Sequence, residues 1–80
     1  MGTMYKTLHS PENARLIAWL KEQRKGQGLT MRDLAGKLNV SHSFIGKIEQ
    51  GERRLDVVEY LHYCLVLGVA PEEGLAVTSG

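Results

Sequence analysis

The sequence predicts an all-α fold in which five short helices form one compact domain. Apolar residues recur at helical spacing in five separate stretches, and each stretch follows a helix start signal such as Ser, Thr, Asp or an early Pro. No stretch alternates apolar and polar residues for long enough to predict a strand. Because a chain of 80 residues buries only roughly 60% of its unfolded surface, we expect a domain that gains stability from a partner copy.

The chain divides into an arm, one domain and a short tail. Residues 1–9 carry little pattern and are expected to be an N-terminal arm, part of which, before Met4, could be an expression remnant. The domain is predicted over residues 10–77, and residues 78–80 form the C-terminal tail. The first helix should start at Ser10, an N-cap residue that is followed by proline, and end at a pair of glycines.

Two short helices joined by a tight turn are predicted in the middle of the chain. Thr30 and Asp33 have the spacing of a capping box, which opens the second helix. Asn39 enters the left-handed region at little cost and can turn the chain sharply. Ser41 then caps a third helix that begins at His42. This arrangement is a helix-turn-helix.

The third helix is predicted to have an apolar side and a polar side. At about 100° per residue, Phe44, Ile45 and Ile48 cluster on one side. A short helix with small, polar and basic groups facing outward is suited to the DNA major groove. The outward residues are His42, Ser43, Gly46, Lys47 and Gln50.

Two further helices complete the predicted fold. Asp56 and Glu59 form a second capping box, and the helix that they open stops at Gly68. Pro71, followed by two acids, begins a last helix that ends near Val77 or two residues earlier.

The composition excludes several classes of site. The single Cys64 cannot form an internal disulfide, and with its neighbour His62 it offers no zinc ligand set, so we expect a core thiol and neither metal nor cofactor. No acid pair, nucleophile with a base, or phosphate loop supports an enzyme. No apolar run reaches membrane length and no signal peptide is evident, which predicts a cytoplasmic protein. Trp19, Tyr60 and Tyr63 are expected in the core or at a dimer surface.

Charge is polarised along the chain although the net charge is only +1. Residues 21–54 hold eight basic and four acidic residues, whereas residues 55–80 hold four acids and no lysine or arginine. The basic block coincides with the helix-turn-helix, which favours an attractive field for DNA on one face. Ordinary solvated helix faces are the alternative interpretation.

The sequence resembles the Cro and C1 type helix-turn-helix family of phage and bacterial regulators, also called the XRE or lambda-repressor-like family. The resemblance runs from about Leu16 to Leu75 and implies a five-helix DNA-binding domain. It rests on the segments RKGQGLT, LAGKLNVS, IGKIEQGERR and LVLGV. The resemblance also implies an ion pair between Arg24 and Glu49, which would orient the third helix. One position departs from the family: Met31 stands where a glutamine often binds a DNA phosphate.

Candidate DNA contacts follow from the chemistry of these positions. Base contacts are predicted for His42, Ser43, Gly46 and Lys47, of which lysine donates to guanine N7 and O6. Glycine inside a helix costs about 1 kcal/mol relative to alanine, which suggests close approach of the DNA at that position. Helix N-termini and arginine side chains bind phosphate. The predicted phosphate contacts are Thr30, Arg32, Ser41, Gln50, Arg53 and Arg54, with Lys25 and Lys37 as weaker candidates.

The function predicted from these features is sequence-specific binding of double-stranded DNA by a transcriptional regulator, in the manner of a repressor. The expected partners are a near-palindromic operator and a second copy, with the dimer contact in residues 69–77 or, as a second candidate, residues 5–8. The alternative is a protein-interaction or scaffold module that keeps the fold without DNA readout. A phage or prophage repressor, a restriction-modification controller and an antitoxin with a toxin partner all remain open.

Overall fold

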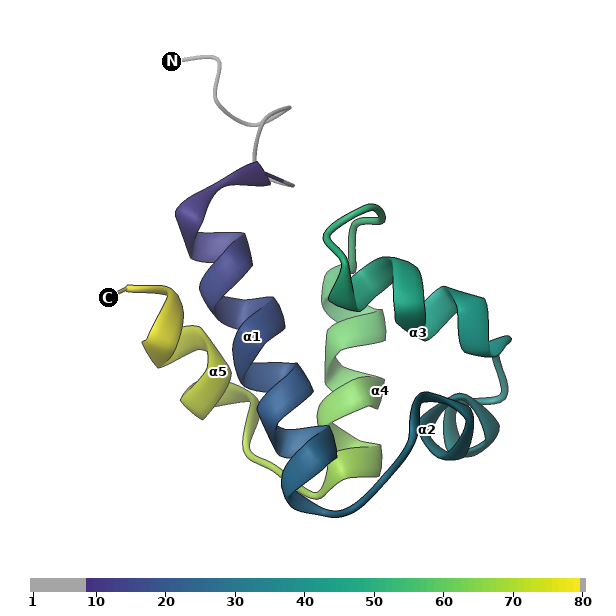
Figure 1. Ribbon diagram of the computed structural model, residues 1–80. Coiled ribbons are helices and arrows are strands. Elements are labelled where there is room, and N and C mark those ends of the chain that lie inside the picture. The colour runs from purple at the N-terminus through teal and green to yellow at the C-terminus, as the bar shows by residue number, and fades with distance from the viewer. Residues whose placement is uncertain (1–8, 80) are drawn as a thin grey trace.

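The computed structural model describes residues 9–79, and this range contains five helices and no strand (Figure 1). The all-α prediction and the order of the helices are confirmed. Most of the predicted arm, including the dimer candidate at residues 5–8, lies outside the described residues. The helices are α1 (Pro11–Gly26), α2 (Met31–Leu38), α3 (His42–Glu49), α4 (Val57–Leu67) and α5 (Pro71–Thr78).

The predicted caps form at the ends of these helices. Ser10 Oγ accepts a hydrogen bond from the Asn13 amide at 3.1 Å and caps α1. The side chains of Asp56 and Glu59 each accept from the other residue's backbone amide, at 2.7 and 3.0 Å, and close the capping box of α4. Gly68 ends α4 with φ of 69°, a left-handed conformation in which glycine has no steric penalty. The last helix continues to Thr78, one residue beyond the predicted end.

The core is built from one side of each of the first four helices. Ten apolar residues are buried, and Cys64 is fully buried among them, which confirms the predicted core thiol. Burial raises the pKa of Cys64, because the thiolate is poorly solvated there. Trp19 packs against this cluster from its edge. The buried apolar residues are Ile17, Leu20, Leu34, Ala35, Ile45, Ile48, Tyr60, Tyr63, Cys64 and Leu67.

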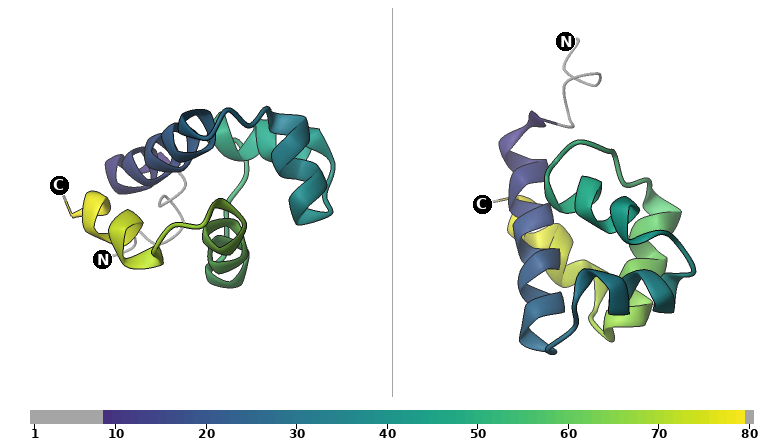
Figure 2. Two further views of the ribbon diagram at one scale, coloured as in Figure 1. Left: turned by 90° about the horizontal axis from the view of Figure 1, so that it is seen from below. Right: turned by 45° about the vertical axis from the view of Figure 1, so that its right-hand side comes forward.

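α5 lies along α1, and α2 packs against α3 and α4 (Figures 1 and 2). α1 also contacts α3, which connects these two sets of helices. Arg15 on α1 fastens the α1–α5 pair, since its guanidinium donates to the carbonyls of Val77 and Thr78 at 3.1 and 2.8 Å. Within residues 69–77, where the sequence placed the dimer contact, Gly74 is buried against the body of the domain, whereas Ala70, Glu72, Glu73, Leu75 and Ala76 are exposed. Of the helices described, none combines the length and apolarity needed to cross a bilayer.

Gly74 is the point of closest approach between α5 and the core. The Tyr60 hydroxyl donates to the Pro71 carbonyl at 2.6 Å and holds the ring beneath this turn of α5. A methyl group at Gly74 would overlap the Tyr60 hydroxyl and lie 2.7 Å from Cζ3 of Trp19. Since both rings are packed, α5 must carry glycine here to reach α1.

We expect Gly74→Ala to lower the free energy of unfolding by about 1 to 3 kcal/mol, because the added methyl overpacks a filled interface. Gly36→Ala is the matched control: it also lies inside a helix, but its methyl would meet no atom within 4 Å. It should raise stability by about 0.5 to 1 kcal/mol. Thermal unfolding followed by circular dichroism measures both, and equal stabilisation by the two substitutions would contradict the packing argument.

Candidate nucleic-acid interface

Local hydrogen bonds fix the start of α2, and a residue in the left-handed conformation ends it. Thr30 Oγ1 accepts from the Asp33 amide at 3.0 Å, and the Asp33 carboxylate accepts from the Thr30 amide at 2.9 Å. These hydrogen bonds lower the pKa of Asp33, because they stabilise the charged carboxylate. Asn39 ends α2 with φ of 59°, as predicted. The helix-turn-helix therefore has the geometry that its sequence indicates.

Two serine hydroxyls lie at the start of α3. Ser41 Oγ accepts from the Phe44 amide at 3.3 Å and lies 3.1 Å from the Ser43 hydroxyl. The predicted DNA contacts at this end of the helix are all exposed: Ser41, His42 and Ser43. A helix N-terminus favours an anion, because its first amides and its dipole both point outward. The end of α3 is thus chemically suited to a phosphate.

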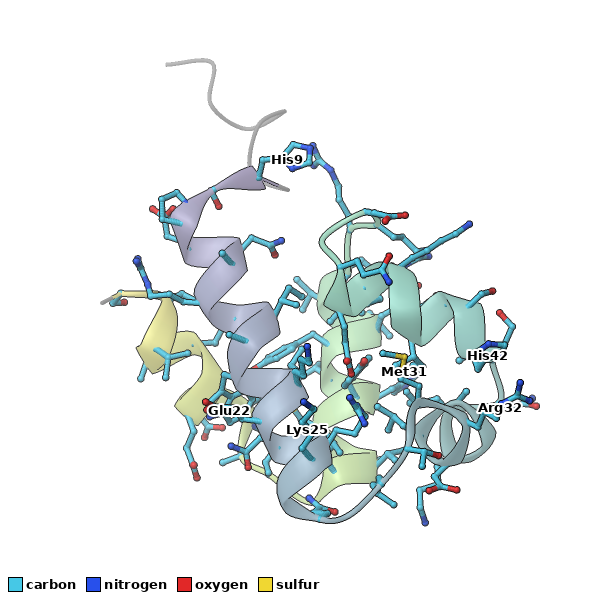
Figure 3. All side chains as sticks on the ribbon, viewed as in Figure 1. His9, Glu22, Lys25, Met31, Arg32 and His42 are labelled. Carbon is cyan, nitrogen blue, oxygen red and sulfur yellow. The ribbon has the colours of Figure 1, made fainter. Side chains whose placement is uncertain are left out.

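The third helix has one buried face and one open face. Ile45 and Ile48 are fully buried, and Phe44 packs against the core from the edge. Figure 3 shows His42 projecting from the first turn of α3, away from the body of the domain. Because the inner face is fixed by the core, the outer residues can change without loss of packing. The exposed outer residues are His42, Ser43, Lys47 and Gln50.

Gly46 lies at the seam between α3 and α2 rather than at the centre of the open face. It is half-buried, and a methyl group added to it would stand 3.8 Å from Sδ of Met31, an ordinary contact distance. Figure 3 shows the Met31 sulfur between the two helices. Nothing in the described part of the domain therefore requires glycine at this position. The contact with Met31 was not predicted, although the sequence had marked that methionine as a departure from the family.

A buried ion pair connects the end of α1 to the end of α3. Arg24 Nε and Nη2 donate to the two carboxylate oxygens of Glu49 at 2.6 and 3.0 Å, and Nη1 donates to the Leu29 carbonyl at 2.7 Å. The side chains are only 7% and 2% exposed. The hydrogen bonds to Glu49 raise the pKa of Arg24. This is the pair that the resemblance implied, and its two-point contact fixes the direction of α3.

Removing the carboxylate should leave a buried guanidinium without its partner. We expect Glu49→Ala to lower the free energy of unfolding by about 3 to 5 kcal/mol, which a domain of this size can scarcely sustain. The double variant Arg24→Met with Glu49→Leu removes both charges and keeps the volume, so it should regain most of that stability. Urea denaturation measures the free energy of unfolding of the parent chain and of both variants. Equal instability of the single and double variants would contradict a penalty from the unpaired buried charge.

Arg53, a predicted phosphate contact, has partners within the domain that the sequence did not indicate. Its guanidinium donates to both carboxylate oxygens of Glu59 at 3.1 and 3.0 Å. Its Cζ also lies 4.3 Å from the centre of the Phe44 ring. The loop after α3 is thus attached to α4 and to α3 itself. The pairing could not be seen in the sequence, because Glu59 was assigned only to its capping box.

The remaining basic residues of the helix-turn-helix region stay at the surface. Two arginines, Arg24 and Arg53, are matched by Glu49 and Glu59 and contribute little net field. The other basic side chains of the block are exposed, and Arg32 projects outward in Figure 3. The exposed set is Lys21, Lys25, Arg32, Lys37, Lys47 and Arg54.

Comparison with known proteins identifies the fold and its motif. A family profile described as helix-turn-helix matches residues 20–73. A solved structure of an XRE-family like protein from Pseudomonas syringae pv. tomato str. DC3000 is similar, with 35% sequence identity and a TM-score of 0.82. The match covers 98% of this chain and 95% of that chain. Among curated proteins, no sequence matches the chain.

Proposed function

The chain belongs to the XRE-type helix-turn-helix family of DNA-binding transcription regulators, and from this premise we propose that it is a repressor of phage, prophage or small-operon type. Repression requires only that the protein occupy a promoter, whereas activation requires a further surface for the polymerase. The observation that carries the proposal is the division of α3, whose inner face is buried at Ile45 and Ile48 while its outer face is polar and exposed. The protein then acts in the cytoplasm, on the nucleoid.

We assign sequence readout to the outer face of α3. Lys47 reaches guanine N7 and O6 in the major groove, and Ser43 and His42 contact neighbouring bases from the first turn. Gly46 allows the DNA to approach the seam closely, because it presents no side chain there; an added methyl group would stand in ordinary contact with Met31 Sδ, at 3.8 Å. These roles agree with the exposure of the three side chains.

Phosphate contacts position this helix on the duplex. Arg54 and Arg32 are exposed at the two ends of the motif, and Thr30 and Ser41 present the N-termini of α2 and α3. Gln50 completes the proposed set at the end of α3. Arg53 could contact a phosphate only while its guanidinium also binds Glu59. We therefore propose Arg53 as a weaker phosphate contact than Arg54.

The proposed working unit is a two-fold dimer on a near-palindromic operator. A single short helix contacts too few bases for useful discrimination, and two copies place their α3 helices about 34 Å apart on one face of the DNA. The same symmetry doubles the phosphate contacts and hence the salt dependence.

We expect the chain to bind double-stranded DNA with a steep salt dependence. Arg54→Ala should lower the slope of log K against log salt by about 0.9 for each phosphate that is no longer neutralised, and it should weaken binding to all sequences alike. Ala76→Glu makes the same change in net charge on α5 and should leave the slope unchanged. Fluorescence anisotropy at several salt concentrations measures the slopes, and identical binding of the parent chain at low and high salt would argue against electrostatic recognition.

Readout and folding should respond separately to substitutions in α3. Lys47→Ala should change stability by less than about 0.5 kcal/mol but remove about 1 to 3 kcal/mol of discrimination at one base pair in each half-site. Gly46→Ala should raise stability by about 1 kcal/mol and yet weaken operator binding, because the methyl meets the DNA. Selection of duplexes from a random pool, together with melting curves, measures both effects. If Lys47→Ala lowered affinity for random and selected DNA equally, Lys47 would be a phosphate contact.

A further inference from the structure

A pocket of about 440 Å³ lies between the N-terminal half of α1 and the end of α3. Residues between His9 and Lys21 form one wall, and Glu49, Gln50 and Gly51 form the other. Its volume falls in the range of roughly 300 to 1,000 Å³ in which proteins bind small organic molecules. The proposed base contacts use no residue of the α1 wall. The pocket is therefore a candidate ligand site beside the DNA-binding face.

The α1 wall combines an apolar floor with one cation. Ala14, Ile17 and Ala18 lie on one side of α1 at spacings of three and four residues. Lys21 follows one turn later on the same side and is exposed. His9 lies at the other end of this wall, at the start of α1 (Figure 3). An elongated ligand along α1 would place its apolar body on the floor and a charged end at the lysine.

Lys21 is the charged group of the pocket that is left for a ligand. The other charged side chain in the walls, Glu49, already accepts hydrogen bonds from Arg24 at 2.6 and 3.0 Å and is 2% exposed. The ion pairs among the described residues do not include Lys21. A lysine ammonium binds a carboxylate through charge-assisted hydrogen bonds, and the exposed amide of Gln50 can also donate to it. This chemistry favours an anion.

We propose that the pocket binds a small organic acid, with an elongated apolar body and one terminal carboxylate, and that the bound acid lowers the affinity of the chain for its operator. The second part rests on the proposed function, in which Gln50 contacts a DNA phosphate. Gln50 lines the pocket, so an acid that binds its amide competes with that phosphate. The carboxylate also neutralises Lys21 and repels DNA phosphates that lie within about 8 Å, the screening length at physiological salt.

An NMR titration of the labelled full chain without DNA tests the site. With 4-phenylbutyrate as the probe, the backbone amide signals of residues 13–21 and 49–51 should shift together, with a dissociation constant below about 1 mM. The alcohol 4-phenylbutan-1-ol lacks the carboxylate and acetate lacks the apolar body, so each should bind at least about tenfold more weakly. Equal binding of acetate and 4-phenylbutyrate, or no binding of the latter at about 10 mM, would overturn the proposal.

Three variants assign the two halves of the ligand. Lys21→Gln should raise the dissociation constant of 4-phenylbutyrate at least about tenfold and change that of the alcohol less than about twofold. Ala18→Phe fills the floor and should abolish binding of both. Lys37→Gln is the matched control, because it removes the same charge on α2, outside the pocket, and should change neither constant. All three positions are exposed, so melting curves should show that the variants fold. Unchanged acid binding by Lys21→Gln would contradict the assignment.

Fluorescence anisotropy with a selected duplex tests the effect on DNA binding. Saturating 4-phenylbutyrate should weaken operator binding at least about fivefold for the parent chain and for Lys37→Gln, but less than about twofold at the same concentration for Lys21→Gln. Because such coupling is reciprocal, the bound operator must weaken acid binding by the same factor. An acid that binds but leaves operator affinity unchanged would refute the regulatory part. A chain that binds the acid but no duplex would refute the proposed function and leave the ligand site standing.

Discussion

The hydrogen-bonded pair of Arg24 and Glu49 is the contact on which the arrangement of the helices depends. It joins the last turn of α1 to the last turn of α3, and a third hydrogen bond from the same guanidinium holds the Leu29 carbonyl at the entrance to α2. Three elements thus meet at one side chain. A buried ion pair contributes little net stability compared with apolar residues of the same volume, but its geometry is strict. We infer that its main effect is to fix the angle at which α3 leaves the core.

The two faces of α3 follow from that constraint. Ile45 and Ile48 are buried against the other helices, so the polar residues must point away from the body. The capped N-termini of α2 and α3 flank this polar face, and the loop after α3 is held by the contact of Arg53 with Phe44 and Glu59. Rigid support of this kind lets exposed side chains meet DNA with little ordering cost. The same rigidity makes α3 sensitive to substitutions in α1.

Much of the fold could be predicted because its signals are local. Thr30 with Asp33, Asp56 with Glu59, and Asn39 each define a helix end through neighbours within a few residues, and the structure forms all of them. Features that join distant segments could not be predicted from the residues alone. α4 is apolar on nearly all sides, so its sequence does not reveal which side is buried and which leaves Val57, Leu61 and Leu65 exposed. The same holds for the contacts of Arg53 and Met31, which depend on the packing of α3.

If α3 and the N-terminal ends of α2 and α3 form the DNA-binding face, DNA must perturb these segments before any other part of the domain. An NMR titration of the labelled chain with a duplex selected from a random pool tests this most directly. We expect the backbone amide signals of residues 30–33, 41–47 and 50–54 to shift together, while those of α5 stay unchanged. Shifts concentrated on α5, with residues 41–47 unaffected at saturating DNA, would contradict this assignment.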